Sequence, residues 1–299
     1  MREQAATRPK VQDRLAAWPS PNRATLSPQR RASEILRHTP TRSVSEGIRP
    51  QSLAHASGGC FRVGYFLPLT KGLFAVSELI VIEGIDGSGK GTQAARLIES
   101  LRAAGRRCEL FSFPRYRDTR FGSKIGDFLN GRFGQLDQVS PFLVSLLFAG
   151  DRFESKQALT RALAENDLVI CDRYVASNIA HQAAKLDGAE RDELIEWVRY
   201  VEHSLYELPQ PHRTVFLDLP VAHATKLIAL KAQRSYTDRA ADLQEADAAY
   251  LQRVHDVYAQ LAAAEPNWLR IDCLEADELK SVDRIAAEVW QAVTRTNGV

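Results

Sequence analysis

Apolar residues recur along most of the chain at two alternating spacings, and this alternation predicts strands and helices in turn. Short runs rich in Ile, Val, Leu and Phe predict buried strands at residues 77–84, 107–113, 167–172, 213–219 and 267–272. Apolar positions at helical spacing predict helices at residues 90–105, 141–163, 192–205, 221–230, 246–263 and 278–293. Strands that alternate with helices predict an α/β fold, in which a parallel sheet carries helices on both faces.

Residues 1–75 lack this pattern and are rich in Arg, Ser and Pro, so we interpret them as a disordered basic extension and place the folded domain at 76–299. Residues 1–60 contain ten Lys and Arg residues and four acidic residues, which gives a net charge of +6, whereas the whole chain carries +2. Three interpretations stay open: an organelle-targeting segment, a basic arm for nucleic acid, or a tail without function that includes a misassigned start. Scattered charges with little aromatic interleaving argue against nucleic acid.

Composition narrows the class of protein. A chain of 299 residues that is 44% hydrophobic and 25% charged is typical of a globular enzyme with a large core, and we expect no membrane partner. The four cysteines, Cys60, Cys108, Cys171 and Cys273, lie far apart and show neither metal-ligand spacing nor a disulfide framework. Cys108 and Cys171 lie in predicted strands, so we expect their thiols to be buried. A reducing compartment fits this pattern, so we expect the protein in the cytoplasm, with organelle targeting by the extension as the alternative.

The stretch EGIDGSGKGTQ at residues 83–93 lies between a predicted strand and a predicted helix. Its spacing, Gly84-x-x-x-x-Gly89-Lys90, is that of a phosphate-binding loop in the expected context. Backbone N–H groups and the helix N-terminus would attract phosphate oxygens, and Lys90 would reach the β and γ phosphates. Gly91 stands where such loops usually carry Ser or Thr, so the hydroxyl that normally contacts Mg²⁺ is missing or shifted to Thr92. The predicted ATP-binding residues are Gly84, Gly87, Ser88, Gly89, Lys90, Gly91 and Thr92.

A pair of charged residues at the end of the strand predicted at 167–172 also indicates phosphate chemistry. Asp172 ends this strand and Arg173 follows it. Ligands in open α/β sheets bind beyond the carboxyl ends of the strands. A carboxylate there is placed for Mg²⁺ or its waters, and an adjacent Arg can stabilise charge on a transferred phosphoryl group.

Three more stretches follow the loop in a fixed order: FPRY at 113–116, LLFAGDR at 146–152 and DRYVASNIAHQ at 172–182, with a weaker one, DLQEADAAYLQRV, at 242–254. With this set of motifs, the chain from about Glu78 to Val293 resembles the thymidylate kinases, the nucleoside monophosphate kinases that make dTDP from dTMP. A phosphate loop alone would not identify the family.

The resemblance implies a role for each matching residue. Asp86 would lie at the acceptor sugar and near Mg²⁺, which Asp172 would also help to hold. Phe148 would stack on thymine and Arg152 would donate to its O4, while Arg173 would contact the acceptor phosphate and the transferred group. The remaining residues that the resemblance places at the acceptor are Arg115, Tyr116, Ser177, Asn178, His181, Gln182 and Glu245.

Elementary chemistry agrees with the implied base pocket. An aromatic ring suits the flat face of thymine, and an Arg donor suits its carbonyl, whereas cytosine would present an amino donor at the same place. Phe148 and Arg152 are four residues apart, so one helix face presents both.

Two features set the chain apart within the family pattern. His181 stands where an aromatic such as Tyr or Phe is usual beside the deoxyribose, which predicts weaker exclusion of ribose or a hydrogen bond to it. The phosphate loop has no Arg of its own, and in this family that goes with a basic lid. The polar stretch KAQRSYTDRAAD at 231–242 would be this lid, and Arg234 or Arg239 would supply the catalytic charge.

The implied protein is a P-loop kinase with a five-stranded parallel sheet, a short lid and a tendency to form homodimers. Its reaction would be in-line transfer of the γ-phosphoryl group of MgATP to dTMP, achieved by positioning and charge neutralisation. Its partners would be the small molecules ATP and dTMP. Two alternatives remain: a kinase for another monophosphate such as dUMP or UMP, and a nucleotide-binding protein without catalysis that docks through its basic tail.

Overall fold

The structure is a computed structural model that describes residues 77–135, 138–230 and 247–294. The chain divides into two units, Met1–Leu67 and Pro68–Val299, and every described residue belongs to the second. The extension expected at residues 1–75 therefore lies outside the described residues. The same holds for the lid stretch, including Arg234 and Arg239, and for Glu245.

Five parallel strands form the central sheet, which confirms the predicted α/β fold. They are β1 (Glu78–Glu83), β2 (Cys108–Ser112), β3 (Leu168–Asp172), β4 (Arg213–Asp218) and β5 (Trp268–Asp272), in the order β2-β3-β1-β4-β5. The strands pair so that Ile82 on β1 lies opposite Asp172 on β3, and Glu83 lies opposite Phe216 on β4. The carboxyl ends of β1, β3 and β4 thus meet at one edge of the sheet, where α/β proteins bind ligands.

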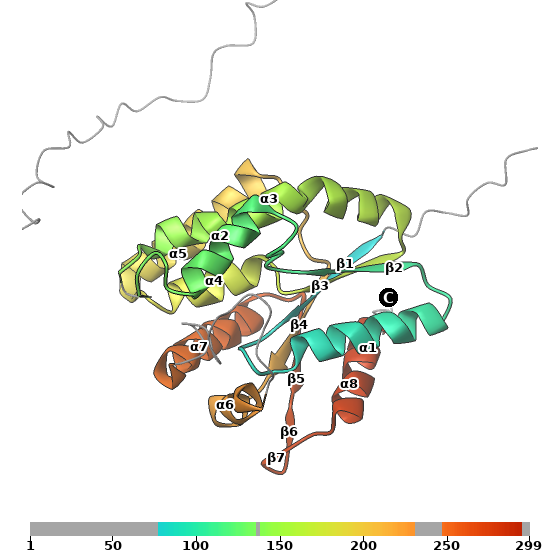
Figure 1. Ribbon diagram of the computed structural model, residues 1–299. Helices are drawn as coiled ribbons and strands as arrows, with labels where there is room; N and C mark the ends of the chain where they lie inside the picture. The colour runs from blue at the N-terminus through green and yellow to red at the C-terminus, as the bar shows by residue number, and fades with distance from the viewer. Residues whose placement is uncertain (1–76, 136–137, 231–246, 295–299) are drawn as a thin grey trace, which may run out of the picture. The chain divides into compact units, whose positions relative to one another are not determined.

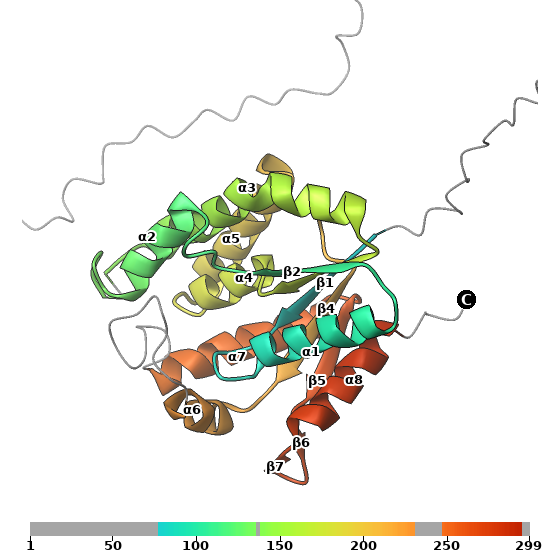
Figure 2. The ribbon, with the colours of Figure 1, turned by 45° about the vertical axis from the view of Figure 1, so that its right-hand side comes forward.

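Helices cover both faces of this sheet (Figures 1 and 2). On one face, α1 (Lys90–Ala103) packs against α8 (Val282–Thr294). On the other face, α4 (Val175–Ala183) packs between α3 (Pro141–Glu165) and α7 (Ala248–Ala264), with α2 (Arg120–Leu129) outside α3 and α5 (Gly188–Arg199) outside α4. Helix α6 (Val221–Ala229) follows β4 and contacts α7.

The boundaries of two predicted helices were wrong. The helix expected at 278–293 begins at Val282, because Glu278–Leu279 forms strand β7, which pairs antiparallel with β6 (Leu274–Glu275). Ser281, whose hydroxyl accepts the N–H of Arg284 at 3.2 Å, starts the helix instead. The helix expected at 192–205 is two elements: α5 begins earlier, at Gly188, and a π-helical segment, Tyr200–Leu205, follows it.

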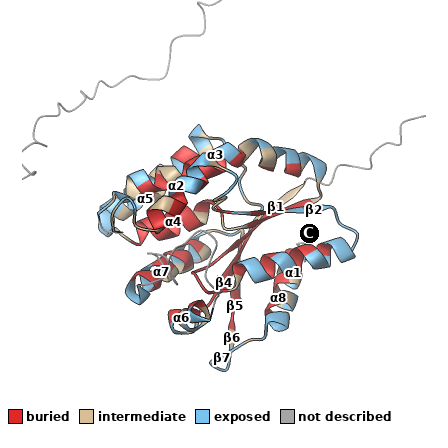
Figure 3. Cartoon of the chain, in the orientation of Figure 1, coloured by how far each residue is buried: buried red, intermediate tan, exposed pale blue. Residues whose placement is uncertain are grey.

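Burial follows the layers (Figure 3). The side chains of β1, β3 and β4 and the inner faces of the surrounding helices form the main core. A smaller cluster of Ile125, Phe128, Leu129 and Val144 joins α2 to α3, and Phe148 packs against it while remaining only partly buried. Cys108 and Cys171 are buried and free, as expected from the sequence, and so is Cys273. None of the described helices combines the length and apolar character needed to cross a membrane.

Candidate active site

The loop between β1 and α1 has the shape of a phosphate cradle. Gly87 and Gly89 both adopt positive φ angles, 86° and 87°, which L side chains rarely adopt. A Cβ atom at Gly87 would also lie 2.5 Å from the carbonyl oxygen of Ala224 on α6, so any larger residue would displace the loop. Lys90 begins α1, is 6% exposed, and donates from Nζ to the carbonyl oxygen of Ile85 at 2.8 Å. The lysine therefore folds back along the loop, and the N-terminus of α1 faces the same edge of the sheet.

Asp172 and Arg173 lie beside this loop, at the carboxyl end of β3. Arg173 has a φ angle of 67°, and its backbone N–H donates to the carbonyl oxygen of Ile82 on β1 at 3.1 Å. This hydrogen bond ties the turn after β3 to the strand that leads into the loop. The Arg173 guanidinium donates to the carboxylate of Asp86, inside the loop. The residues that the sequence predicted for phosphate chemistry thus meet at one edge of the sheet.

Helix α4 continues directly from this turn and carries four of the predicted acceptor residues, Ser177, Asn178, His181 and Gln182, all of them buried. The His181 Nε2 atom lies 4.0 Å from Asp86 Oδ2, and its Nδ1 atom lies 3.1 Å from the Tyr250 hydroxyl on α7. Burial lowers the pKa of His181 to about 3, against a smaller upward effect of Asp86. The imidazole is therefore neutral at physiological pH.

Arg152 on α3 lies in the core rather than at the surface, with 2% of its side chain exposed. Its Nε and Nη2 groups both donate to the carboxylate of Glu202, the Nη2 bond at 2.7 Å. Asn178 donates from Nδ2 to the same carboxylate at 2.8 Å and to the carbonyl oxygen of Ser145 at 3.0 Å. Glu202 thus joins two residues that the resemblance assigns to base recognition. A guanidinium carries five N–H donors, so two bonds to Glu202 leave others for a ligand.

Another buried carboxylate organises the segment after β2. Asp151 is fully buried and accepts the backbone N–H of Arg115 at 2.9 Å and the Thr119 hydroxyl at 2.5 Å. Burial raises the pKa of Asp151, although these hydrogen bonds and nearby arginines oppose the shift. The Arg115 side chain itself pairs with Asp118 at 3.0 Å and lies over the Phe111 ring. Asp151 therefore fixes the backbone of the stretch that holds Arg115 and Tyr116.

Several buried polar atoms in this region have no hydrogen-bond partner among the described residues. Four such atoms belong to residues that the sequence had assigned to the site: Ser88 Oγ, Asp172 Oδ1, Asn178 Oδ1 and Gln182 Nε2. Buried polar groups in native proteins are normally paired, so atoms left unpaired call for a ligand, an ion or water. All four atoms belong to the phosphate loop, the end of β3 or α4, the elements that the sequence assigns to the nucleotide site.

These residues fit a magnesium ion. Asp172 has a buried Oδ1 atom without a partner among the described residues, and its Oδ2 atom lies beside the first turn of α1. Asp86 lies in the adjoining loop. Among the described residues, no group of three or more His, Cys, Asp or Glu side chains is placed to hold a metal ion. Magnesium commonly keeps several waters and binds through one or two carboxylates together with phosphates, so a sparse protein donor set suits it.

The sequence did not predict three buried carboxylates near the site: Asp151, Glu83 and Glu202. Asp151 and Glu83 both stand inside recognised motifs, directly beside Arg152 and Gly84, and a search for polar residues in strands and helices that are otherwise buried would have found them. Glu202 offered no such signal, because it is 50 residues from Arg152 and belongs to no motif. Thr92, the alternative hydroxyl of the phosphate loop, lies exposed on the first turn of α1.

Comparison with known proteins agrees with this geometry. A family model described as thymidylate kinase matches residues 82–283. The thymidylate kinase of Mycobacterium tuberculosis is 38% identical over 185 residues, which cover 62% of this chain and 86% of that protein. The enzyme of Deinococcus radiodurans is 31% identical over 227 residues, which cover 76% of this chain and 98% of that protein.

A solved structure points the same way. The thymidylate kinase of Candida albicans superimposes with a TM-score of 0.57 at 26% sequence identity, over 73% of this chain and 91% of that one. The family model covers more than half of the chain, and the match to the bacterial relatives spans most of their length. The chain with this loop, this Asp-Arg turn and these buried polar residues therefore belongs to the thymidylate kinase family.

Proposed function

We propose that this chain transfers the γ-phosphoryl group of ATP to dTMP and releases dTDP and ADP. An oxygen of the dTMP phosphate attacks the γ phosphorus, and the bond from that phosphorus to the bridging oxygen of ADP breaks. The observation that carries the proposal is the meeting of the phosphate loop with the Asp172–Arg173 turn at one edge of the sheet, where Arg173 contacts Asp86. Membership of the family supplies the substrate.

The charge of each site residue determines the role that we assign to it. Phosphoryl transfer depends mainly on positioning and on neutralising the charge of the transferred group. In our proposal, Lys90 and the loop backbone hold the ATP phosphates, and Arg173 contacts the acceptor phosphate and the group in transit. Asp172 and Asp86 would hold Mg²⁺, which would supply positive charge against the phosphates. Arg234 or Arg239, outside the described residues, adds a further positive charge.

The base pocket follows from α3 and α4. Phe148 offers a partly buried ring to thymine, and Arg152 has donors left for the O4 carbonyl. Glu202 supports this role because it holds the guanidinium in one orientation. Asn178 and Gln182 each leave a buried polar atom that a ligand can satisfy. Cytosine would place an amino donor against the guanidinium, and this repulsion favours dTMP over dCMP.

The deciding experiment measures ADP production with dTMP, dUMP, dCMP and UMP in parallel. We expect good turnover of dTMP, some of dUMP and little of dCMP. Lys90→Ala and Arg173→Ala should both fold and each lose about a hundredfold or more in turnover. Equal use of dCMP would contradict the thymine pocket, preference for UMP would favour a ribonucleotide kinase, and ATP binding without turnover of any monophosphate would favour a non-catalytic protein.

We also expect a homodimer. Large apolar side chains are exposed on and after α3 and α5, namely Leu143 (62%), Phe153 (49%), Tyr200 (55%) and Leu205 (59%). A second copy that covers this surface would account for them. Light scattering after size-exclusion chromatography should give twice the chain mass, and Leu143→Glu should give a monomer. A monomeric unmodified protein would refute the dimer without affecting the proposed reaction.

A further inference from the structure

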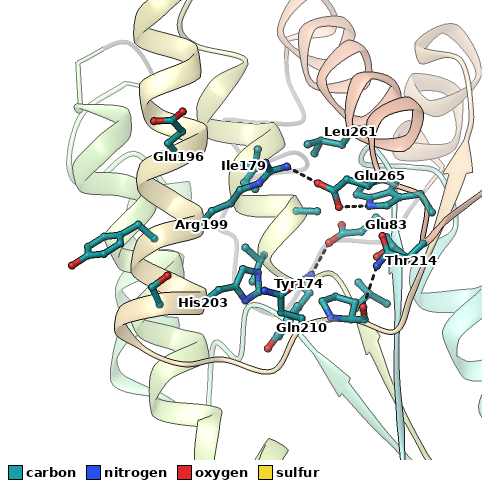
Figure 4. Close-up of a pocket in the computed structure, with 18 residues that line it drawn as sticks. Glu83, Tyr174, Ile179, Glu196, Arg199, His203, Gln210, Thr214, Leu261 and Glu265 are labelled. Atoms are coloured by element: carbon teal, nitrogen blue, oxygen red, sulfur yellow. Dashed lines mark hydrogen bonds and ion pairs between the residues drawn. The ribbon is translucent and has the colours of Figure 1, made fainter. Parts of the chain in front are cut away.

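Glu83 ends β1 and is fully buried, yet the proposed reaction assigns it no role. Its Oε1 atom accepts the backbone N–H groups of Tyr174 at 2.8 Å and Ser177 at 3.1 Å. Its Oε2 atom accepts the Ser177 hydroxyl at 2.6 Å and the Tyr258 hydroxyl at 3.0 Å. Figure 4 shows the carboxylate pointing at Tyr174. Four donors from two helices thus converge on one carboxylate.

The two backbone bonds cap the start of α4. Tyr174 is the residue before the helix, and Ser177 is its third residue, so both N–H groups belong to the turn that has no partners within the helix. A side chain at the start of a helix usually satisfies such groups, but the side chain of Tyr174 does not do so here. Glu83 takes this role from a neighbouring strand, and its negative charge suits the positive end of the helix dipole.

The same carboxylate reaches Arg173 through one side chain. The Ser177 hydroxyl, which donates to Glu83, lies 3.4 Å from Nη1 of Arg173. The other end of the guanidinium, Nη2, donates to Asp86. Arg173 is therefore held between a carboxylate in the phosphate loop and a hydroxyl that Glu83 orients.

The ionisation state of Glu83 also supports a role in holding its neighbours in place. Burial raises the pKa of Glu83, while the hydrogen bonds and the nearby positive charge of Arg173 oppose that rise. All four neighbours of the Glu83 oxygens can donate, so the geometry suits the ionised carboxylate. An ionised, fully hydrogen-bonded carboxylate in the core is costly to keep and ties its partners to one arrangement.

We propose that Glu83 is a positioning residue for Arg173: it fixes the first turn of α4 and the Ser177 hydroxyl so that the guanidinium faces the transferred phosphoryl group. This inference rests on the proposed kinase reaction and extends it to a residue that touches no substrate. If Glu83 only held β1, α4 and α7 together, its substitution would lower the stability of the fold and leave kcat unchanged. If Glu83 positions Arg173, its substitution also lowers kcat, and does so only while Arg173 is present.

The test is a double-mutant cycle with Glu83→Gln and Arg173→Ala, measured on dTMP with ATP. Glu83→Gln keeps the shape of the side chain but removes its charge and puts a donor opposite the hydroxyls. We expect kcat to fall roughly tenfold to a hundredfold, with KM for both substrates changed by less than about threefold, because the misplaced charge acts mainly in the transition state. In the Arg173→Ala background, the same substitution should change kcat by less than about twofold, since the residue through which it acts is gone.

Glu265→Gln is the matched control. Glu265 lines the same 610 Å³ cavity as Glu83 and also accepts two donors, Arg199 at 2.5 Å and the Trp268 indole at 2.9 Å (Figure 4). Its hydrogen-bonding partners, Arg199 and Trp268, lie outside α4, so its variant should melt earlier but keep kcat. If Glu83→Gln does not yield folded protein, Ser177→Ala takes its place in the cycle, because it removes the hydroxyl between Glu83 and Arg173.

The outcomes separate the two proposals. Unmodified protein that does not phosphorylate dTMP refutes the proposed reaction. Active protein in which Glu83→Gln leaves kcat unchanged, or lowers it equally with and without Arg173, refutes the positioning role and leaves the reaction standing.

Discussion

The Oδ2 atom of Asp172 lies 3.1 Å from the point at which Gly91 would carry a Cβ atom. The absence of a side chain at Gly91 therefore lets the end of β3 approach the first turn of α1. This contact gives a structural meaning to the departure from the usual loop, because the residue type that normally brings a hydroxyl to Mg²⁺ would here press on the carboxylate that we assign to the same ion.

Gly91→Ser should reduce the Mg²⁺ concentration needed for half-maximal turnover. The Asp172 carboxylate has one oxygen without a partner among the described residues, so it can shift by the few tenths of an ångström that the new Cβ requires, and the hydroxyl then joins the site. Gly91→Ala adds the same crowding without the hydroxyl and should need as much Mg²⁺ as the unmodified protein, or more. Titration of turnover with Mg²⁺ at fixed ATP distinguishes them, and identical curves for the two variants would contradict the expectation.

Glu202→Gln should destabilise the fold by about 3 kcal/mol, because it leaves the buried Arg152 charge without its counter-ion. The exposed pair of Lys156 and Glu207, 3.1 Å apart, provides the comparison, and Glu207→Gln should cost less than about 1 kcal/mol. Urea denaturation gives both free energies of unfolding. Equal losses would mean that burial does not strengthen the Arg152 pair.

His181 should make the protein less stable in mild acid. Its folded pKa of about 3 is far below the unfolded value near 6.5, so below pH ~6.5 the unfolded chain takes up a proton that the folded chain refuses. The contribution of His181 to the free energy of unfolding is therefore complete above that pH and is lost as the pH drops towards the folded pKa. We expect a loss of about 2 kcal/mol between roughly pH 6.5 and 5. Urea denaturation of His181→Gln should show a smaller loss over the same interval. Equal losses in both proteins would mean that His181 protonates readily in the fold.

Arg234→Ala and Arg239→Ala test the lid that we expect outside the described residues. A charge delivered when the lid closes acts mainly on the transition state, so at least one variant should lose turnover while ATP binding changes little. Lys226→Ala removes an exposed positive charge from α6 and serves as the control for net charge. If both arginine variants turn over normally, the charge comes from another residue.

A chain that starts at Val76 with an added Met should fold and phosphorylate dTMP like the full chain. The first described strand begins at Glu78, and all the site residues follow it. Termini tolerate removal when no backbone hydrogen bonds of the fold depend on them. Melting temperature and kcat of the two proteins provide the comparison, and an insoluble or inactive short chain would place part of residues 1–75 in the fold.

Local pattern predicted the sheet well, because strands buried on both faces are short continuous apolar runs, as in residues 79–82 of β1. It missed α4 for a related reason. Eight of the nine residues of that helix are buried, so no alternation of apolar and polar positions marks it. Motifs located Asp86, Lys90 and Arg173, since their spacing is local. The residue that holds Arg152 was harder to find, because Glu202 meets Arg152 only through tertiary packing.

The π-helical segment Tyr200–Leu205 carries Glu202 and so has a consequence for insertions and deletions. A π turn holds one residue more than an α turn for nearly the same rotation, so deleting one residue of this segment is absorbed when the π turn becomes an α turn. α5 and Glu202 would then keep nearly the same orientation, and Arg152 would keep its carboxylate. A one-residue deletion inside α5, where no π turn absorbs it, would instead rotate the residues before it by about 100° relative to Glu202. We therefore expect relatives to tolerate a one-residue gap at 200–205 better than a gap within 188–199.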